Sequence, residues 1–358
     1  MLPYIMLFLV SLILTFISYK LPKDRKNGGI FLAFIVFLMF FIIQAIRYDV
    51  GTDFLGTYTK EYYNVLYGHI SNKLDIGFVF LYKLIIFLNL NKQWIFVLSA
   101  LIFNVFIFRS IFKRSKNPAI SLFVFFLGTF FFFSMNGIRQ SIAISIFYYS
   151  LQYISDRNLK KYLLLNFVGI LFHSSTILLL PLYFILTHKF TRNQRIITMV
   201  LLIVSMGFIG PKIIELISMT KYRGYLINKA YNVEGTISLS SIVNIIVYIL
   251  FEINDRKNID DKEYNIYLNM HFFGVIVTIL STAIVIIFRL FLSFRFVEFL
   301  SIPYLVYYVN KINIKKKNKI ILYCAIIAIF VGYFIYCIVI KNYNDTVPYK
   351  TIFNFLYN

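Results

Sequence analysis

The chain has 358 residues, of which 60% are hydrophobic and only 14% are charged. A soluble domain carries about 25% charged residues, so this composition and a mean hydropathy of +0.77 exclude a soluble globular protein. Lys and Arg number 36 against 15 Asp and Glu, which gives a net charge of +21. These basic residues form short clusters between apolar runs, a pattern typical of cytoplasmic loops rather than of a nucleic-acid-binding surface.

Uncharged runs of nearly membrane-spanning length recur along the chain. Because a spanning helix needs roughly 20 apolar residues and the runs are continuous rather than alternating, helices are favoured over a barrel. We therefore predict an all-α polytopic membrane protein with about 11–12 transmembrane or re-entrant helices, forming one transmembrane domain over 1–358. The predicted spans are 2–19, 29–46, 76–90, 94–112, 118–135, 137–154, 162–187, 196–217, 237–253, 265–288, 293–310 and 320–340.

The basic clusters predict which loops face the cytoplasm. They lie at Lys20–Lys26, Arg109–Lys116, Arg157–Lys161, Lys189–Arg195, Arg256–Lys262 and Lys311–Lys319. Most intervals between clusters hold two spans. The interval between residues 26 and 109 holds three, and the interval between 161 and 189 holds one long run interrupted at His173. A re-entrant or broken segment in each of these two intervals would restore parity, because such segments are tolerated where they line a cavity.

This topology places four polar stretches on the outer face. They are the loop at about 47–75, the segment Asn136–Gln140, a hairpin around Arg289–Arg295, and the tail 341–358. A further outer loop, 218–235, joins them. We expect function to lie where these stretches converge.

Arg139 is the strongest single signal, because a charged residue placed within a span is costly and indicates function by default. Asn136, Arg139 and Gln140 are spaced i, i+3, i+4, so they share one helix face. The planar fork of an arginine suits phosphate or carboxylate. The alternative is that Arg139 snorkels to the interface and Asn136 caps the helix.

The second outer stretch of interest follows the span 29–46. Arg47, Asp49 and Asp53 gather two carboxylates and a guanidinium around Gly51, which permits a turn. Tyr58 and neighbouring tyrosines follow, and aromatic faces with polar edges suit a sugar. The alternative is an interfacial aromatic belt with a salt-bridged turn.

Other polar residues add to this set. His173 interrupts an apolar run and could act as a general base or simply hydrogen-bond a neighbouring helix. Arg289 supplies the second outer arginine that a diphosphate would need, whereas Arg295 can pair with Glu298 at i, i+3. Tyr349 lies in a tail motif too short to interpret physically, and we include it among the predicted substrate-binding residues.

Several absences narrow the chemistry. The sequence has no phosphate-binding P-loop, no Cys/His metal constellation and no Gly-x-Ser-x-Gly elbow. None of its four histidines has an Asp four residues later. These absences argue against a simple nucleophilic hydrolase, and we predict neither a metal nor a cofactor.

Four motifs occur in order along the chain: Arg47 to Asp53 with Tyr58, Asn136 to Gln140 with Ala143, Phe172-His173-Ser174, and Arg289 with Pro303 downstream. In order and spacing they resemble the EpsG-type polysaccharide polymerases, relatives of the Wzy O-antigen and capsule polymerases. The resemblance covers residues 47 to about 303. It departs at Asp75, where the family more often has Glu before the glycine, and at Arg295, which offers a second match for Arg289.

The resemblance implies a metal-independent glycosyltransferase in the bacterial cytoplasmic membrane. Its substrate would be an oligosaccharide repeat unit on undecaprenyl diphosphate, and it would move the growing chain onto a new unit at the outer face. Membrane lipid and a chain-length regulator are the further partners considered, and nucleic acid is not expected.

The residue roles follow the same resemblance together with the charges. Arg139 and Arg289 would hold the diphosphate, and His173 or a carboxylate, Asp53 or Asp49, would take the acceptor proton. The remaining predicted substrate ligands are Arg47, Asp49, Tyr58, Asn136, Gln140, Arg295 and Tyr349.

Three rival functions remain open. A flippase for the same lipid-linked sugar would use the same arginines, although transporters often show internal repeats and none is visible here. A different membrane glycosyltransferase could use lipid-monophosphate sugars. A non-enzymatic scaffold is disfavoured by the polar residues within the spans.

Overall fold

The computed structural model describes residues 1–22, 25–72, 74–220, 223–224, 237–255, 261–284, 287–312 and 315–353. Within these residues the chain is almost entirely helical, and five helices are long and apolar enough to cross a membrane, or up to eight when each bent pair counts as one span. The predicted all-α polytopic fold is confirmed. The chain forms two compact units, residues 1–180 with 302–358, and residues 181–301.

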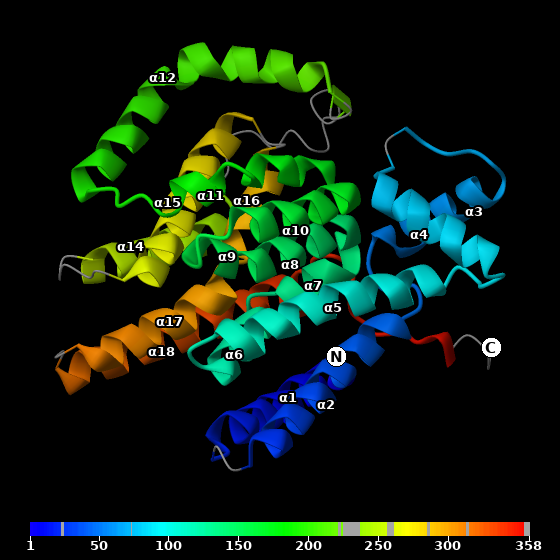
Figure 1. Ribbon diagram of the computed structural model, residues 1–358, viewed down its shortest axis with the longest axis horizontal. Coiled ribbons are helices and arrows are strands. Elements are labelled where there is room, and N and C mark those ends of the chain that lie inside the picture. The colour runs from blue at the N-terminus through cyan, green and yellow to red at the C-terminus, as the bar shows by residue number, and fades with distance from the viewer. Residues whose placement is uncertain are drawn as a thin grey trace. The chain divides into compact units, whose positions relative to one another are not determined.

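The first unit is built around α8, nearly all of whose residues are buried. Helix α8 packs against α5 and α10, while α2 packs against α1 and α5 (Figure 1). The helices and helical turns of this unit are α1 (Leu2–Lys20), α2 (Lys26–Ala45), η2 (Phe54–Thr59), α3 (Lys60–Leu66), α4 (Ile76–Phe87), α5 (Trp94–Arg114), α6 (Pro118–Leu127), α7 (Phe130–Asn136), α8 (Ile138–Ser150), α9 (Gln152–Ser155), α10 (Leu159–Phe172), η3 (Ser174–Leu179), α18 (Lys316–Phe334) and η6 (Ile335–Ile340).

The second unit holds α11 (Leu182–Ile185), α12 (Arg192–Ser218), α14 (Leu239–Asp255), α15 (Lys262–Ala283) and α16 (Phe288–Arg295). Helix α17 (Glu298–Lys311) begins in this unit and continues into the first at Ile302. Helix α15 packs against α12, α14 and α16. Thr191 and Gln194 form a reciprocal capping box that fixes the start of α12.

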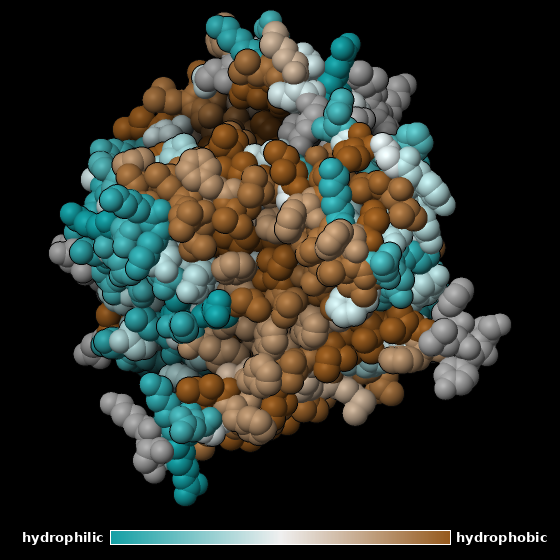
Figure 2. Space-filling view, turned by 45° about the vertical axis from the view of Figure 1, so that its right-hand side comes forward, coloured by the Kyte–Doolittle hydropathy of each residue, from teal (hydrophilic) through white to brown (hydrophobic). Residues whose placement is uncertain are grey.

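Apolar side chains on the outside of the helices mark the surfaces that face lipid. Helix α1 leaves Leu2, Met6, Leu9 and Ile13 exposed. Figure 2 shows hydrophobic residues covering much of the visible face, with hydrophilic residues gathered toward its edges. Exposing such an apolar surface to water is unfavourable, whereas the hydrocarbon core of a bilayer accommodates it.

The two intervals with odd span counts contain short or broken helices. Helix α4 has 12 residues and α10 has 14, so they reach about 18 and 21 Å, short of the roughly 30 Å of a bilayer core. Helix α10 ends where His173 turns extended, at φ −153°. The Tyr162 hydroxyl then donates to the Leu179 carbonyl at 2.7 Å, so the chain doubles back beside α10. The predicted break at His173 is confirmed.

One predicted turn is wrong. The segment Arg289–Arg295 was expected to be a hairpin between spans, but it is helix α16, joined to α17 by a bend of 41°. The span before it ends at Ala283 rather than at residue 288. The reason is the apolar spacing: Phe288, Phe291 and Phe294 recur every three residues, and the last two are buried on one face of α16.

Two other expectations are settled only in part. The predicted span 118–135 is two helices, α6 and α7, bent by 53° at Thr129, which adopts a left-handed conformation (φ 66°). The predicted outer loop 218–235 lies largely outside the described residues.

Gly77 fixes how closely α4 approaches α10. A Cβ on Gly77 would lie 2.9 Å from the Leu171 carbonyl oxygen and 3.2 Å from the Phe172 ring. No methyl group fits at that distance from a helix backbone without displacing one helix. The glycine therefore sets the spacing that brings Asp75, two residues earlier, to the end of α10.

We expect Gly77→Ala to lower the apparent unfolding temperature of the purified protein. The overpacking penalty, about 1–3 kcal/mol, exceeds the gain of about 1 kcal/mol that alanine brings to a helix. Gly332→Ala in α18 is the matched control, because no atom lies within 4 Å of its added Cβ. Equal unfolding temperatures for the two variants would contradict the close-approach argument.

Candidate functional site

Three of the four predicted outer stretches meet in the first unit. The tail runs beside the loop after α2: the Tyr48 N–H donates to the Lys350 carbonyl at 3.0 Å, and the Gly51 N–H donates to the Asp345 carbonyl at 2.9 Å. Arg47 and Thr351 form a single β-bridge. Gly51 adopts φ 97°, a conformation that favours glycine.

Asn136, at the end of α7, connects these segments. Its side-chain oxygen accepts from the Thr52 hydroxyl and from the Asp53 N–H, both at 2.9 Å. Its amide nitrogen donates to Asn344 Oδ1 at 3.2 Å, and its carbonyl accepts from the Tyr58 hydroxyl at 3.1 Å. One asparagine thus ties the loop, the helix junction and the tail together.

Arg139, Asp75 and His173 converge from three helix ends. Arg139 Nη1 lies 3.3 Å from Asp75 Oδ2, and His173 Nδ1 lies 3.7 Å from the same oxygen. The Ser174 N–H donates to the other carboxylate oxygen at 3.3 Å. We call these three side chains the Asp75 cluster.

In this cluster a buried carboxylate, Asp75, pairs with a partly exposed cation, Arg139. The side chain of Asp75 is only 3% exposed and that of His173 is 10% exposed, whereas Arg139 keeps 27% exposure. Buried charges are tolerated only when they are paired, so Asp75 needs Arg139. Part of the Arg139 side chain stays exposed while it pairs with Asp75.

Tyr58 stands beside the cluster. Burial raises the pKa of Tyr58 to about 12, and the nearby charge of Arg139 opposes that rise. Its hydroxyl therefore stays protonated near neutral pH and donates to Asn136. Asp53 also lies near this tyrosine and accepts from the Thr57 hydroxyl at 3.2 Å.

Arg47 is buried beneath the loop rather than displayed on it. Burial lowers the pKa of Arg47 to about 10, which still leaves it protonated near pH 7. Its guanidinium lies 5.2 Å from the centre of the Phe96 ring, a cation–π distance. Among the described residues its Nε has no hydrogen-bond partner. The role of Arg47 as a substrate ligand stays a prediction.

The other predicted substrate ligands of the first unit, Asp49, Gln140 and Tyr349, are buried or contact other protein groups. Asp49 pairs with Lys350 across the exposed loop–tail junction, at 3.3 Å. Gln140 is buried on α8. The Tyr349 hydroxyl donates to the Ile43 carbonyl at 2.8 Å, and its ring meets Tyr4 edge-on. These contacts anchor the tail, and the substrate-binding roles stay predictions.

Arg289 and Arg295 belong to the second unit. Arg289 lies in the first turn of α16, and Arg295 is buried with its Nε 3.5 Å from the fully buried Glu298 carboxylate. The i, i+3 pairing that the sequence suggested for Arg295 and Glu298 is therefore present.

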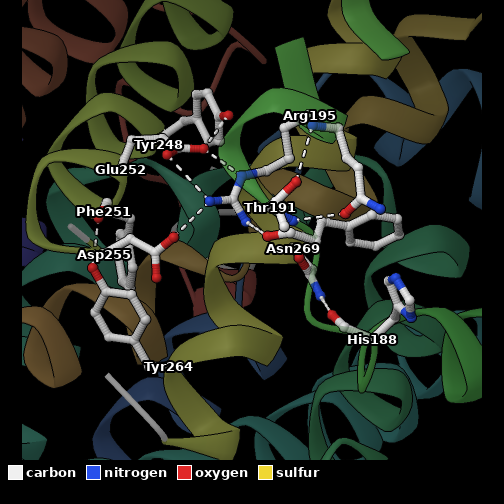
Figure 3. Close-up of polar contacts among 11 residues, drawn as sticks. His188, Thr191, Arg195, Tyr248, Phe251, Glu252, Asp255, Tyr264 and Asn269 are labelled. Atoms are coloured by element: carbon white, nitrogen blue, oxygen red, sulfur yellow. Dashed lines mark hydrogen bonds and ion pairs between the residues drawn. The ribbon is translucent and has the colours of Figure 1, made fainter. Parts of the chain in front are cut away.

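The second unit also holds a polar cluster that sequence patterns did not single out (Figure 3). The buried Arg195 guanidinium donates to Glu252 and Asp255 from α14, and to the Phe190 carbonyl at 2.7 Å. The Tyr248 hydroxyl donates to the same Glu252 carboxylate. Nε and both Nη atoms of Arg195 donate to protein acceptors, so this cluster holds α12 against α14.

Sequence reasoning named Arg139 and His173 but missed Asp75 as their shared partner. The available signals were the place of Asp75 as an added carboxylate in the loop at about 47–75 and the departure of the Asp75-Ile76-Gly77 segment from the family pattern. Arg139 is 64 residues away in the chain, and Ser174, whose N–H also donates to Asp75, is 99 residues away. Only the tertiary contact between α4 and α10 reveals the relationship.

The fold and these sites define a multi-pass helical membrane protein with a polar centre at one end of its first unit. The model of the EpsG family matches residues 30–351, most of the chain, and the protein belongs to that family. It is therefore a membrane protein of polysaccharide biosynthesis. Comparisons with the curated proteins and with the solved structures gave no match.

We expect Asn136→Ala to loosen the tail. The substitution leaves Thr52 and the Asp53 N–H of the loop without an acceptor and Asn344 of the tail without a donor. The loss of about 1–3 kcal/mol raises the open population roughly 5- to 150-fold. The measurement is the rate of trypsin cleavage after Lys341 and Lys350 in the folded protein. Asn310→Ala, which removes only an exposed contact to Tyr323, serves as the control. Equal cleavage rates for both variants would contradict the claim that Asn136 holds the tail in place.

Proposed function

We propose that this protein is a polysaccharide polymerase. It joins undecaprenyl-diphosphate-linked oligosaccharide repeat units into O-antigen, capsule or exopolysaccharide by glycosyl transfer at the outer face of the bacterial cytoplasmic membrane. Membership of the EpsG family supports a role in polysaccharide biosynthesis. The observation that carries the proposal is the Asp75 cluster, in which a reachable arginine and a histidine share one buried carboxylate.

In the proposed reaction, the donor is the growing chain on its lipid diphosphate. A hydroxyl oxygen of the incoming repeat unit attacks the anomeric carbon and forms a new C–O bond. The bond between that carbon and the diphosphate oxygen breaks, and its electron pair leaves on the diphosphate. The acceptor hydroxyl gives up its proton to a base.

Arg139 is the group suited to the leaving diphosphate. Charge builds on the leaving oxygen as the bond breaks, and a guanidinium fork stabilises it with charge-assisted hydrogen bonds. Removing one such donor commonly lowers kcat by roughly 10²–10³. The 27% exposure of Arg139 leaves room for this contact while Asp75 holds the side chain in place.

His173 is the best-placed general base among the predicted candidates. Asp75 faces Nδ1 of the ring, so a proton taken up by the imidazole is stabilised by the carboxylate. Asp75 itself already serves Arg139 and the Ser174 N–H. Asp49 pairs with Lys350, and Asp53 accepts from Thr57, which makes both less available.

A transporter of the same lipid-linked oligosaccharide is the rival that uses the same arginine. The two functions differ in where unpolymerised repeat units collect. Loss of a transporter traps single units inside the cell, whereas loss of a polymerase leaves single units displayed on the surface.

We expect Arg139→Ala to collapse the long-chain glycan ladder to single surface-displayed repeat units. The gene is deleted and replaced by wild type or variant, membrane levels are checked by blot, and glycans are separated on a gel. Arg139→Lys should retain part of the ladder if charge is the main requirement, and His173→Gln should impair polymerisation as well. Arg109→Ala, an exposed arginine on α5, is the control.

Two results would contradict the proposal. An unchanged ladder with Arg139→Ala at normal membrane level would make Arg139 structural. An unchanged ladder after complete deletion of the gene would exclude polymerisation, and units trapped inside the cell would favour transport.

A further inference from the structure

A recess opens in the first unit beside the loop that follows α2, and none of the residues of the Asp75 cluster lines it. Its volume is about 580 Å³, within the range of small-molecule sites. Aromatic rings line it: Tyr48, Tyr62, Tyr63 and Trp94, together with Lys92 and Gln93 from the turn before α5. We call this recess the aromatic groove.

The protein holds these rings in place from behind. The Tyr62 hydroxyl donates to the Leu90 carbonyl at 3.0 Å, and Gln93 Nε2 donates to the Ala45 and Arg47 carbonyls at 2.7 and 2.9 Å. Tyr62 and Tyr63 meet edge-on at 5.4 Å. These contacts preform the groove in the absence of a ligand.

Two of the rings that line the groove are exposed. Tyr63 is 40% exposed and Trp94 is 39% exposed. The Lys92 ammonium lies 5.5 Å from the centre of the Tyr63 ring, and no acidic side chain is among the described residues that line the groove. The groove thus offers ring faces beside a cation and amide groups, which suits a flat, hydroxyl-rich ligand that is neutral or acidic.

The segment formed by η2 and α3 contributes side chains both to the surroundings of Arg139 and to the groove. Tyr58 of η2 reaches Asn136, while Tyr62, four residues later, lines the groove. One short segment of the chain therefore contributes to both places.

We propose that the aromatic groove is a glycan subsite that stacks a pyranose of the repeat unit against Tyr63 and Trp94, with Lys92 and the neighbouring amides binding its hydroxyls or carboxylate. This inference rests on the proposed polymerase function for the identity of the glycan. The ring faces contact the apolar C–H face of the sugar, and the subsite holds the chain while its end reaches Arg139.

Trp94 makes the subsite directly measurable, because it is the only tryptophan in the chain. The full-length protein is placed in nanodiscs, since glycoside detergents would themselves present sugars. The probe is oligosaccharide of one to three repeat units, released by mild acid from the polysaccharide of cells carrying the gene, with no lipid or phosphate. Trp94 emission is followed as the probe is added.

We expect a saturable change in Trp94 emission. Tyr63→Ala should weaken the apparent affinity about fivefold, the middle of the range for one aromatic contact. Tyr67→Ala is the matched control, because Tyr67 lies on the same loop and is 71% exposed but does not line the groove. Size-exclusion profiles confirm that each variant is folded.

Three outcomes would overturn the subsite. They are no change in emission with glycan, the same affinity for Tyr63→Ala and wild type, and a saturable change produced only when phosphatidylglycerol is added to the nanodisc. The last would make the rings a lipid anchor. Saturable glycan binding together with an unchanged ladder in the deletion strain would leave the subsite standing and remove the polymerase proposal.

Discussion

The buried carboxylate of Asp75 is the constraint on which the rest of the site depends. An uncompensated charge inside an apolar protein is strongly unfavourable, so Asp75 must be met by a cation and by hydrogen-bond donors. Arg139 from α8 and the Ser174 N–H beyond α10 supply them. The ends of α4, α8 and α10 therefore have to meet, and Gly77 gives the clearance that lets them.

This constraint explains why the chain breaks α10 where it does. A continuous helix through His173 would use the backbone N–H groups of the next turn inside the helix. With the break, the Ser174 N–H is free to face Asp75, and the following turn folds back beside Tyr162. Irregular backbone is tolerated in a membrane protein where protein groups satisfy it, and here the break also places an imidazole beside the carboxylate.

A second set of polar contacts holds the loop after α2 against Asn136 and the tail. Asn136 binds the loop and the tail from one position, and Tyr349 and Thr351 hold the tail against the end of α2. The loop in turn carries Tyr58 toward Arg139 and Tyr62 toward the aromatic groove. The outer loop is thus a structured part of the proposed site.

The sequence predicted much of this arrangement, because apolar run length and charge placement are local signals. They gave the helical membrane fold and the break at His173, and they singled out Arg139, whose functional role stays a prediction. The missing parts depend on distant contacts: Asp75 finds its partners 64 and 99 residues away, and Arg195 finds Glu252 and Asp255 57 and 60 residues away. The Arg289–Arg295 segment was misread because its charges suggested a turn, whereas its Phe spacing favours a helix.

The most direct measurement replaces Asp75 itself. Asp75→Asn keeps the size of the side chain but removes the charge that pairs with Arg139 and His173, while Asp75→Glu keeps the charge. With both variants at normal membrane level, the account predicts that Asp75→Asn reduces the glycan ladder to single surface-displayed repeat units and that Asp75→Glu retains long chains in part. A full ladder with Asp75→Asn would contradict the claim that the Asp75 cluster is the polymerising centre.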